Sequence, residues 1–243
     1  MLTELAEQTY KMYLEDENIT TQLPLNNIFF VEDMIQAVSK LQPQLLERVG
    51  FDKEQLYNCG GHTLLFPDNT ATILIKIDGE MNDFWWMGTL VHELTHVKDY
   101  SDYFNVLKVS TFWEMLSDIP FWLWTEFHAR YKGILYVFKL AKNLPQNLYE
   151  MYIDNTRQRI IDFPDIIKKD IPYQKKGYLT MHIIGEILAC EKLSVNELKS
   201  DIDNLVATFD WFGGMKDFLS KHTENITREQ MLLISMNARR IFD

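Results

Sequence analysis

The stretch "MGTLVHELTHVKDYSD", Met87 to Asp102, sets two histidines four residues apart, with a glutamate directly after the first. On an α-helix, residues i and i+4 lie on the same face, so His92 and His96 can both aim an imidazole nitrogen at one point. Glu93 lies about 100° round the helix, beside that point. Catalytic zinc sites take such histidine nitrogens, a third protein ligand and a water. The spacing therefore predicts that His92 and His96 bind zinc and that Glu93 is the general base.

A second interpretation is a helix that carries two histidines and binds no metal. The preceding segment "FWWMGTLV" (residues 84–91) is strongly apolar, so the motif is expected to lie in a buried helix. Two histidines and a glutamate are costly to bury without a partner. We therefore favour the metal site, and the metal-free helical protein stays as the alternative.

Two helices and a β-hairpin are expected before the motif. Apolar residues recur at helical spacing in Leu2–Asp16 and in Val31–Val49, where Pro43 is an expected interruption. The runs "HTLLF" (62–66) and "TATILIKID" (70–78) are separated by the turn sequence "PDN" and predict a hairpin. In the second run, residues 71, 73, 75 and 77 predict a buried face, and the alternate residues predict a wetter face.

From Asp83 onward the pattern is helical, with breaks expected at Pro145, at Pro164, at residues 172–177 and at residues 213–214. The chain contains no internal repeat and no Gly/Ser linker. We expect one domain over residues 1–243, with a catalytic core over about residues 1–143 and a helical carboxy-terminal part over 144–243. The predicted fold class is α+β: a mostly helical domain with a small β-sheet packed beside the H-E-x-x-H helix.

The charge balance and the cysteines indicate the class of protein. Lys and Arg total 24 against 35 Asp and Glu, a net charge of -11, which argues against a nucleic-acid-binding surface. The amino terminus lacks the features of a secretory signal, and no apolar run reaches the roughly 18 residues of a membrane span. Cys59 and Cys190 lack C-x-x-C partners, as expected of free thiols in a reducing compartment. We expect a cytoplasmic protein with no membrane association.

A hairpin, then a helix bearing H-E-x-x-H, then a downstream helix bearing a glutamate resembles the gluzincin-type zinc metallopeptidases. More narrowly, it resembles the ImmA/IrrE family of small bacterial and phage regulatory metallopeptidases. The resemblance covers roughly residues 69–131. It implies a zincin-like fold, a zinc cofactor and cleavage of a peptide bond in a regulatory protein partner.

Two candidates for the third zinc ligand follow the motif closely. Asp102 occupies the last place of an H-E-x-x-H-x-x-G-x-x-H/D pattern, but that pattern needs a glycine where Asp99 stands, so the helix is expected to run on. Glu114 lies in "FWEMLSDIP" (112–120), which looks like the thermolysin group, with Asp118 in the place of an aspartate that orients a ligand histidine. Asp118 is equally well explained as the N-cap of the next helix.

The preferred third ligand is Glu126, in the apolar segment "PFWLWTEFHARYKG" (120–133). A carboxylate among such residues needs a compensating charge, and zinc supplies one. The piece "TEFHARY" also looks like the ImmA/IrrE pattern, in which the ligand glutamate is followed by an alanine and an aromatic residue. The alternative that needs no metal is an ion pair with Arg130 on the same helix.

With His92, His96 and Glu126 on zinc, Glu93 is expected to accept a proton from a water that the metal activates and to pass it to the departing amine. In zincins, the strand before the catalytic helix commonly pairs with extended substrate, so strand 70–78 is expected to bind a protein or peptide substrate. No further cofactor is expected. The alternative function is a catalytically silent zincin-fold module that binds a protein partner.

Several other side chains are weaker candidates. Four could stabilise an oxyanion, although packing or surface roles are favoured for all of them: Tyr100, Tyr103, His128 and His182. His182 and Glu186 lie four residues apart and form a second possible metal pair, for which an ordinary core helix is the favoured explanation.

Overall fold

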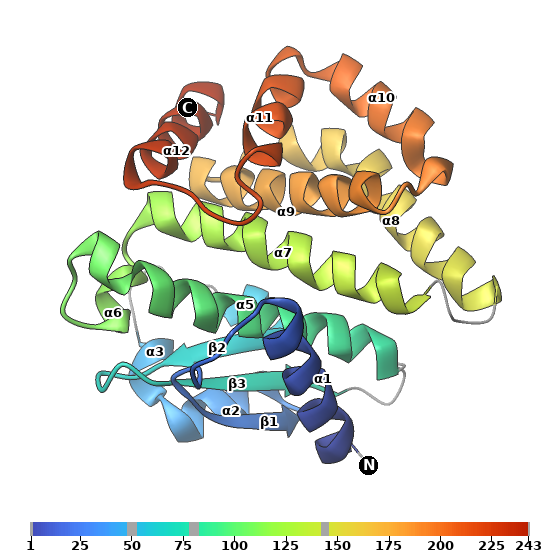
Figure 1. Ribbon diagram of the computed structural model, residues 1–243. Helices are drawn as coiled ribbons and strands as arrows, with labels where there is room; N and C mark the ends of the chain where they lie inside the picture. Colours follow the sequence, from blue (N-terminus) through green and yellow to red (C-terminus); the bar gives the residue numbers. More distant parts are fainter. Residues whose placement is uncertain (1, 48–52, 78–82, 142–145, 243) are drawn as a thin grey trace. The chain divides into compact units, whose positions relative to one another are not determined.

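The computed structural model describes residues 2–47, 53–77, 83–141 and 146–242 (Figure 1). The chain divides into two compact units, Met1–Met115 and Leu116–Asp243. Most described residues are helical and one small mixed sheet is present, which confirms the α+β, mostly helical class. The division falls after residue 115, whereas the sequence suggested a single domain with an internal division near residue 143.

The first unit contains the sheet and the motif helix. Its elements are α1 (Leu2–Asp16), β1 (Leu25–Val31), α2 (Met34–Leu41), α3 (Pro43–Leu46), α4 (Lys53–Asn58), β2 (Gly61–Leu65), β3 (Ala71–Lys76), α5 (Asp83–Leu107) and α6 (Phe112–Met115). Strands β2 and β3 are antiparallel, which confirms the hairpin. Asn69 in its turn has a φ of 62°, a left-handed conformation that asparagine tolerates.

Strand β1 was not expected from the sequence, which predicted a helix from Val31. It pairs in parallel with β3, and the helix begins at Met34 instead. Asp33 caps that helix, because its Oδ1 accepts a hydrogen bond from the backbone N–H of Gln36 at 2.9 Å. Pro43 separates α2 from α3, as predicted. Residues 48 and 49, the end of the predicted helix, lie outside the described residues.

Strand β3 is the centre of the sheet, whose strand order is β1-β3-β2. Helix α5 covers one face, and helices α2 to α4 cover the other (Figure 1). Leu74, on the second face, packs with Leu64 and Val38 in a buried apolar cluster. The expected wetter face of this strand is therefore wrong for Thr72 and Leu74, both of which are buried.

Both edges of β3 are also occupied. Its backbone pairs with β1 over Ala71–Lys76 and with β2 over Ala71–Ile75. A substrate strand has no edge to join there, so the expected substrate position along strand 70–78 is wrong for the residues of β3. Asp78 lies outside the described residues. Strands β1 and β2 form the edges of this three-stranded sheet.

In the described part of the second unit, every regular element is a helix. Its elements are α7 (Ile119–Ala141), α8 (Gln146–Ile167), α9 (Tyr173–Lys192), the 3-10 turn η1 (Asn196–Leu198), α10 (Lys199–Thr208), α11 (Asp210–Ser220) and α12 (Arg228–Phe242). Helices α7 and α9 lie side by side and α12 packs on both (Figure 1). At Gly185 of α9, an added Cβ would lie 2.9 Å from the backbone oxygen of Phe127, so the two helices approach closely.

Only some of the expected helix breaks occur. The break expected over residues 172–177 is confirmed only at Pro172, because residues 173–177 already belong to α9. Pro164 lies within α8, and Gly213 and Gly214 lie within α11. Pro164 is close to the end of its helix, where few turns remain to be disrupted. A glycine within a helix costs only about 1 kcal/mol, which packing readily outweighs. Pro145 lies outside the described residues.

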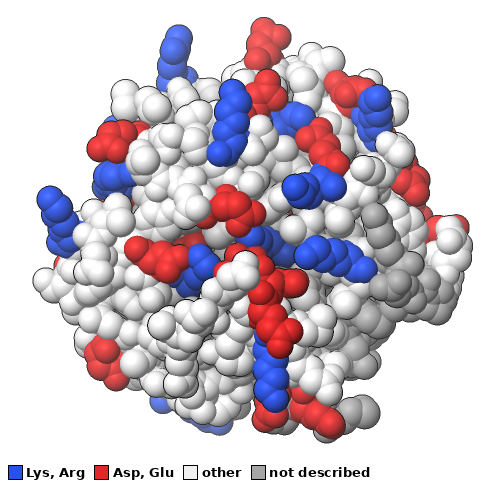
Figure 2. Space-filling view, viewed as in Figure 1, with Lys and Arg blue, Asp and Glu red and all other residues white. Residues whose placement is uncertain are grey.

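Surface charge and helix composition concern two expectations from the sequence, that the protein binds neither nucleic acid nor a membrane. Figure 2 shows acidic and basic side chains interspersed over the face in view, rather than the basic excess that nucleic-acid-binding surfaces usually present. Among the described residues, no helix combines the length and the apolar character needed to cross a bilayer. The cytoplasmic location stays a prediction from the sequence.

Candidate functional site

Helix α5 carries the H-E-x-x-H motif through the interior of the first unit. It packs against β2, β3 and α1, and Leu90, Leu94 and Val97 are fully buried. A helix surrounded by neighbours is apolar on most of its circumference, which explains the apolar residues before and within the motif. The helix ends at Leu107, and Lys108 follows with a left-handed φ of 54°. The motif histidines are therefore held in the middle of a regular helix.

The imidazoles of His92 and His96 converge. Their Nε2 atoms lie 3.1 Å apart, and the two ring planes are at 83° to each other. Two nitrogens at about 2.05 Å from one tetrahedral ion lie roughly 3.3 Å apart, so this pair fits two ligands of a single zinc ion. The same separation also suits a hydrogen bond in which one ring N–H donates to the other ring. The arrangement thus fits zinc and leaves the metal-free alternative to experiment.

Glu93 is directed at strand β2. Its side chain is only 5% exposed, and its Oε2 accepts a hydrogen bond from Thr63 Oγ1 at 2.7 Å. The backbone of Gly61 passes directly beside it: an added Cβ there would lie 2.8 Å from Glu93 Oε1. The sequence analysis missed both β2 residues, and the one signal was the Gly60–Gly61 pair at the start of a strand. The carboxylate that the motif offers as a base is thus confined by the sheet.

Two of the third-ligand candidates have local partners in the first unit. Asp102 is exposed on α5, which runs on past residue 99 as expected, and its Oδ2 lies 2.6 Å from Lys98 Nζ. Glu114 is exposed at the start of α6, where its Oε2 accepts a hydrogen bond from the backbone N–H of Ser110 at 3.0 Å. Its own N–H donates to Thr111 Oγ1 at 3.3 Å. Both carboxylates are accounted for by salt-bridge or helix-start contacts.

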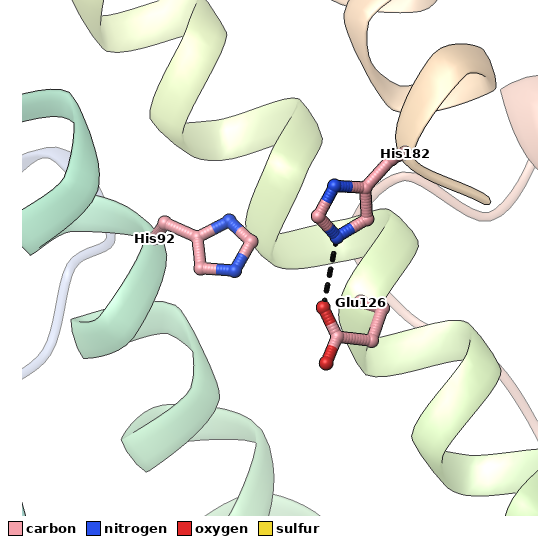
Figure 3. Close-up of side chains that lie close together, drawn as sticks. All are labelled: His92, Glu126 and His182. Atoms are coloured by element: carbon pink, nitrogen blue, oxygen red, sulfur yellow. Dashed lines mark hydrogen bonds and ion pairs between the residues drawn. The ribbon is translucent and has the colours of Figure 1, made fainter. Parts of the chain in front are cut away.

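Glu126, the preferred candidate, lies on α7, and its partners in the second unit include a histidine and a tryptophan. Its Oε2 lies 2.9 Å from His182 Nε2, on α9 (Figure 3). Its Oε1 accepts a hydrogen bond from Trp122 Nε1 at 3.1 Å. Tyr178 stacks on Trp122 and packs on His182, with ring centroids 5.7 Å and 4.2 Å apart. The other side chain drawn in Figure 3, His92, belongs to α5 of the first unit. The Trp122 indole and the His182 imidazole thus each orient one oxygen of the Glu126 carboxylate.

The alternative ion pair between Glu126 and Arg130 is not what the structure shows. Arg130 donates to Glu186 through Nε at 2.7 Å and also through Nη2, and Arg159 donates to both oxygens of Glu186 at 2.9 Å. Burial raises the pKa of Glu186, but the two guanidinium groups outweigh it and hold that pKa below its ordinary value. Since Glu186 is bound by arginines and His182 by Glu126, these two residues of α9 do not form a metal pair together.

Other candidates have structural roles. Asp118 caps α7, because its Oδ1 accepts a hydrogen bond from the backbone N–H of Phe121 at 2.8 Å. Tyr100 and Tyr103 are buried, and His128 stacks on a tryptophan ring at 4.9 Å. Burial raises the pKa of the Cys190 thiol to about 12, so this cysteine is not a nucleophile. These environments agree with the packing roles favoured from the sequence.

Comparison with models of known protein families gave no match, and comparison with curated proteins and with solved structures likewise gave no significant similarity. The resemblance to the ImmA/IrrE family therefore depends on the motif and its surroundings.

Proposed function

We propose that this chain is a zinc-dependent metallopeptidase in which His92 and His96 bind the ion, Glu126 is the third ligand and Glu93 is the general base. The observation that carries the proposal is the convergence of two imidazole nitrogens, 3.1 Å apart, on the helix that also bears a buried glutamate. Two converging imidazoles and an adjacent buried carboxylate are the side chains that a catalytic zinc site uses.

Each side chain has a separate part in the reaction. A zinc ion supplies Lewis acidity, which activates water near neutral pH and polarises a carbonyl oxygen. Glu93 takes the proton from the attacking water and delivers it to the departing amine. The hydrogen bonds from Trp122 and His182 orient the Glu126 carboxylate, as outer partners of ligating carboxylates do.

The proposed substrate is an extended segment of a regulatory protein, as the resemblance to the ImmA/IrrE family implies. Because β3 is paired on both sides, a substrate strand needs an edge strand, and β2 is the edge strand whose Thr63 binds Glu93 of the motif. The substrate is proposed to add to the outer edge of β2, where backbone hydrogen bonds supply affinity and alternate side chains supply specificity.

Zinc content tests the ligand set directly. Protein purified without chelator is compared as wild type, His92→Ala, Glu126→Ala and the matched control Glu114→Ala. We expect about one zinc per chain in the wild type and in Glu114→Ala, and almost none in the other two. If Glu114→Ala lost its zinc and Glu126→Ala kept it, Glu114 would be the third ligand instead. A wild type that binds no added zinc would refute the site.

Turnover is tested with internally quenched peptides and denatured casein. Glu93→Gln is expected to keep its zinc and to lose hydrolysis, because the amide has no basic oxygen to take the proton. Undiminished hydrolysis by purified Glu93→Gln would remove the base role. A zinc-loaded wild type that binds protein partners but cleaves none would favour the silent binding module.

A further inference from the structure

We propose that strand β2 positions the general base, so that the Glu93 carboxylate lies beside the two histidines and outside the ligand set. The hydroxyl of Thr63 binds the carboxylate, and the absence of a side chain at Gly61 leaves room for it. This inference rests on the proposed function, because it assigns a partner to Glu93 in that role. Thr63 is a positioning residue, since it acts through Glu93.

The hydrogen bond from Thr63 is short and shielded. Thr63 Oγ1 lies 2.7 Å from Glu93 Oε2, and the Glu93 side chain is 5% exposed, so little water competes for the carboxylate. A hydrogen bond to a charged group is stronger than one between two neutral groups. Threonine is branched at Cβ, which restricts χ1 and so fixes the direction of its hydroxyl. Thr63 thus defines where one oxygen of Glu93 lies.

Gly61 provides the space for the other oxygen. A Cβ at this position would lie 2.6 Å from Thr89 Cγ2 and 2.8 Å from Glu93 Oε1. Gly61 and Thr63 are two residues apart on β2, so both lie on the strand face that meets α5. The carboxylate is therefore held between a hydroxyl and a strand backbone, and any larger residue at Gly61 would displace it.

This confinement matters because Glu93 directly follows one proposed zinc ligand and precedes the other by three residues. A carboxylate in such a place can either bind the ion or accept a proton from water. A carboxylate oxygen that is bound to the metal is a poor acceptor for the proton of the attacking water. By tying Oε2 to the sheet, Thr63 keeps Glu93 available as a base.

The test uses cobalt(II) in place of zinc, added to metal-free protein, with visible absorption as the readout. Cobalt absorbs more weakly as its coordination number rises above four, so the spectrum reports an added carboxylate ligand. Thr63→Ser keeps the hydroxyl and is expected to give the wild-type spectrum. Thr63→Val removes this hydrogen bond to Glu93 and is expected to weaken the absorption, with a roughly tenfold loss of peptide hydrolysis through kcat rather than KM.

The Glu93→Ala background separates positioning from a merely structural effect. There Thr63→Val is expected to leave the cobalt spectrum unchanged, whereas a general distortion of the site would change it in both backgrounds. A folded Thr63→Val with the wild-type spectrum would overturn the inference and leave the zinc site standing. If Thr63→Val does not fold, Thr63→Ala serves with the same expectations. A wild type that binds no cobalt would overturn the proposed function itself, and this inference with it.

Discussion

Two carboxylates of the second unit, one turn apart along the α7–α9 contact, are held in different ways. Glu126 on α7 meets His182 on α9, and four residues further along both helices Arg130 meets Glu186. Glu186 is bound by two guanidinium groups. Glu126 is bound by an uncharged indole N–H and an imidazole. The same pair of helices thus contains one carboxylate in a charged cluster and one held mainly by oriented aromatic partners.

The difference separates a structural carboxylate from a candidate ligand. Glu186 is 1% exposed, and a charge so deeply buried is stable only when it is paired, which Arg130 and Arg159 accomplish within the unit. Glu126 is held in a defined orientation by an indole N–H and an imidazole, as expected of a ligating carboxylate with outer hydrogen-bond partners. Glu126 is less deeply buried than Glu186, and the chemistry of their partners separates the two carboxylates further.

The largest expected effects come from removing the carboxylates of Glu186 and Glu126 in separate variants. Glu186→Ala leaves two guanidinium groups facing a buried gap, so the free energy of unfolding is expected to fall by about 3 kcal/mol. Glu126→Ala removes two hydrogen bonds in a less buried place and is expected to lower it by about 1 kcal/mol, while abolishing zinc binding. Urea unfolding and zinc content measure the two effects. Equal destabilisation by both variants, with zinc retained in both, would erase the distinction.

The close approach of the two helices is tested at two glycines of α9. Gly185→Ala sets a Cβ 2.9 Å from the backbone oxygen of Phe127 and 3.0 Å from the backbone nitrogen of Tyr131, so a helix backbone must move. We expect a loss of about 2 kcal/mol in the free energy of unfolding. In Gly177→Ala, the matched control, the nearest atom is Leu123 Cδ2 at 3.0 Å, the end of a flexible side chain, and the change is expected to be under about 1 kcal/mol. The reverse order would contradict the close contact between α7 and α9 at Gly185.

The smallest expected effect is a difference between the wild type and Glu186→Gln in how the free energy of unfolding depends on pH. Because the folded-state pKa of Glu186 is lowered, its contribution to stability is fully present above its unfolded pKa, about 4.3, and is lost as the pH falls through the folded value. The wild type is therefore expected to be more stable than Glu186→Gln at neutral pH, and the gap should narrow in acid. Urea unfolding at a series of pH values measures it. A gap that widened in acid would mean that the pKa is raised instead.

Local patterns were sufficient for several elements of the fold. The helix over Leu2–Asp16, the hairpin around residues 67–69 and the start of α7 after Asp118 were all anticipated. Each depends on periodicity, turn residues or a cap, which are properties of a few consecutive residues. The approach of His92 to His96 belongs to the same class, since i and i+4 side chains meet on any regular helix.

Tertiary structure decided the rest, because the deciding partners are remote in sequence. The face of β3 opposite α5 is buried because helices α2 to α4 cover it. Residues 25–31 form strand β1 because they pair with β3. Thr63 lies 30 residues from Glu93, and His182 lies 56 residues from Glu126. The sequence by itself determined which side chains could do chemistry on one helix, since helical geometry is local. Which groups hold those side chains in place depends on long-range packing, which no short pattern encodes.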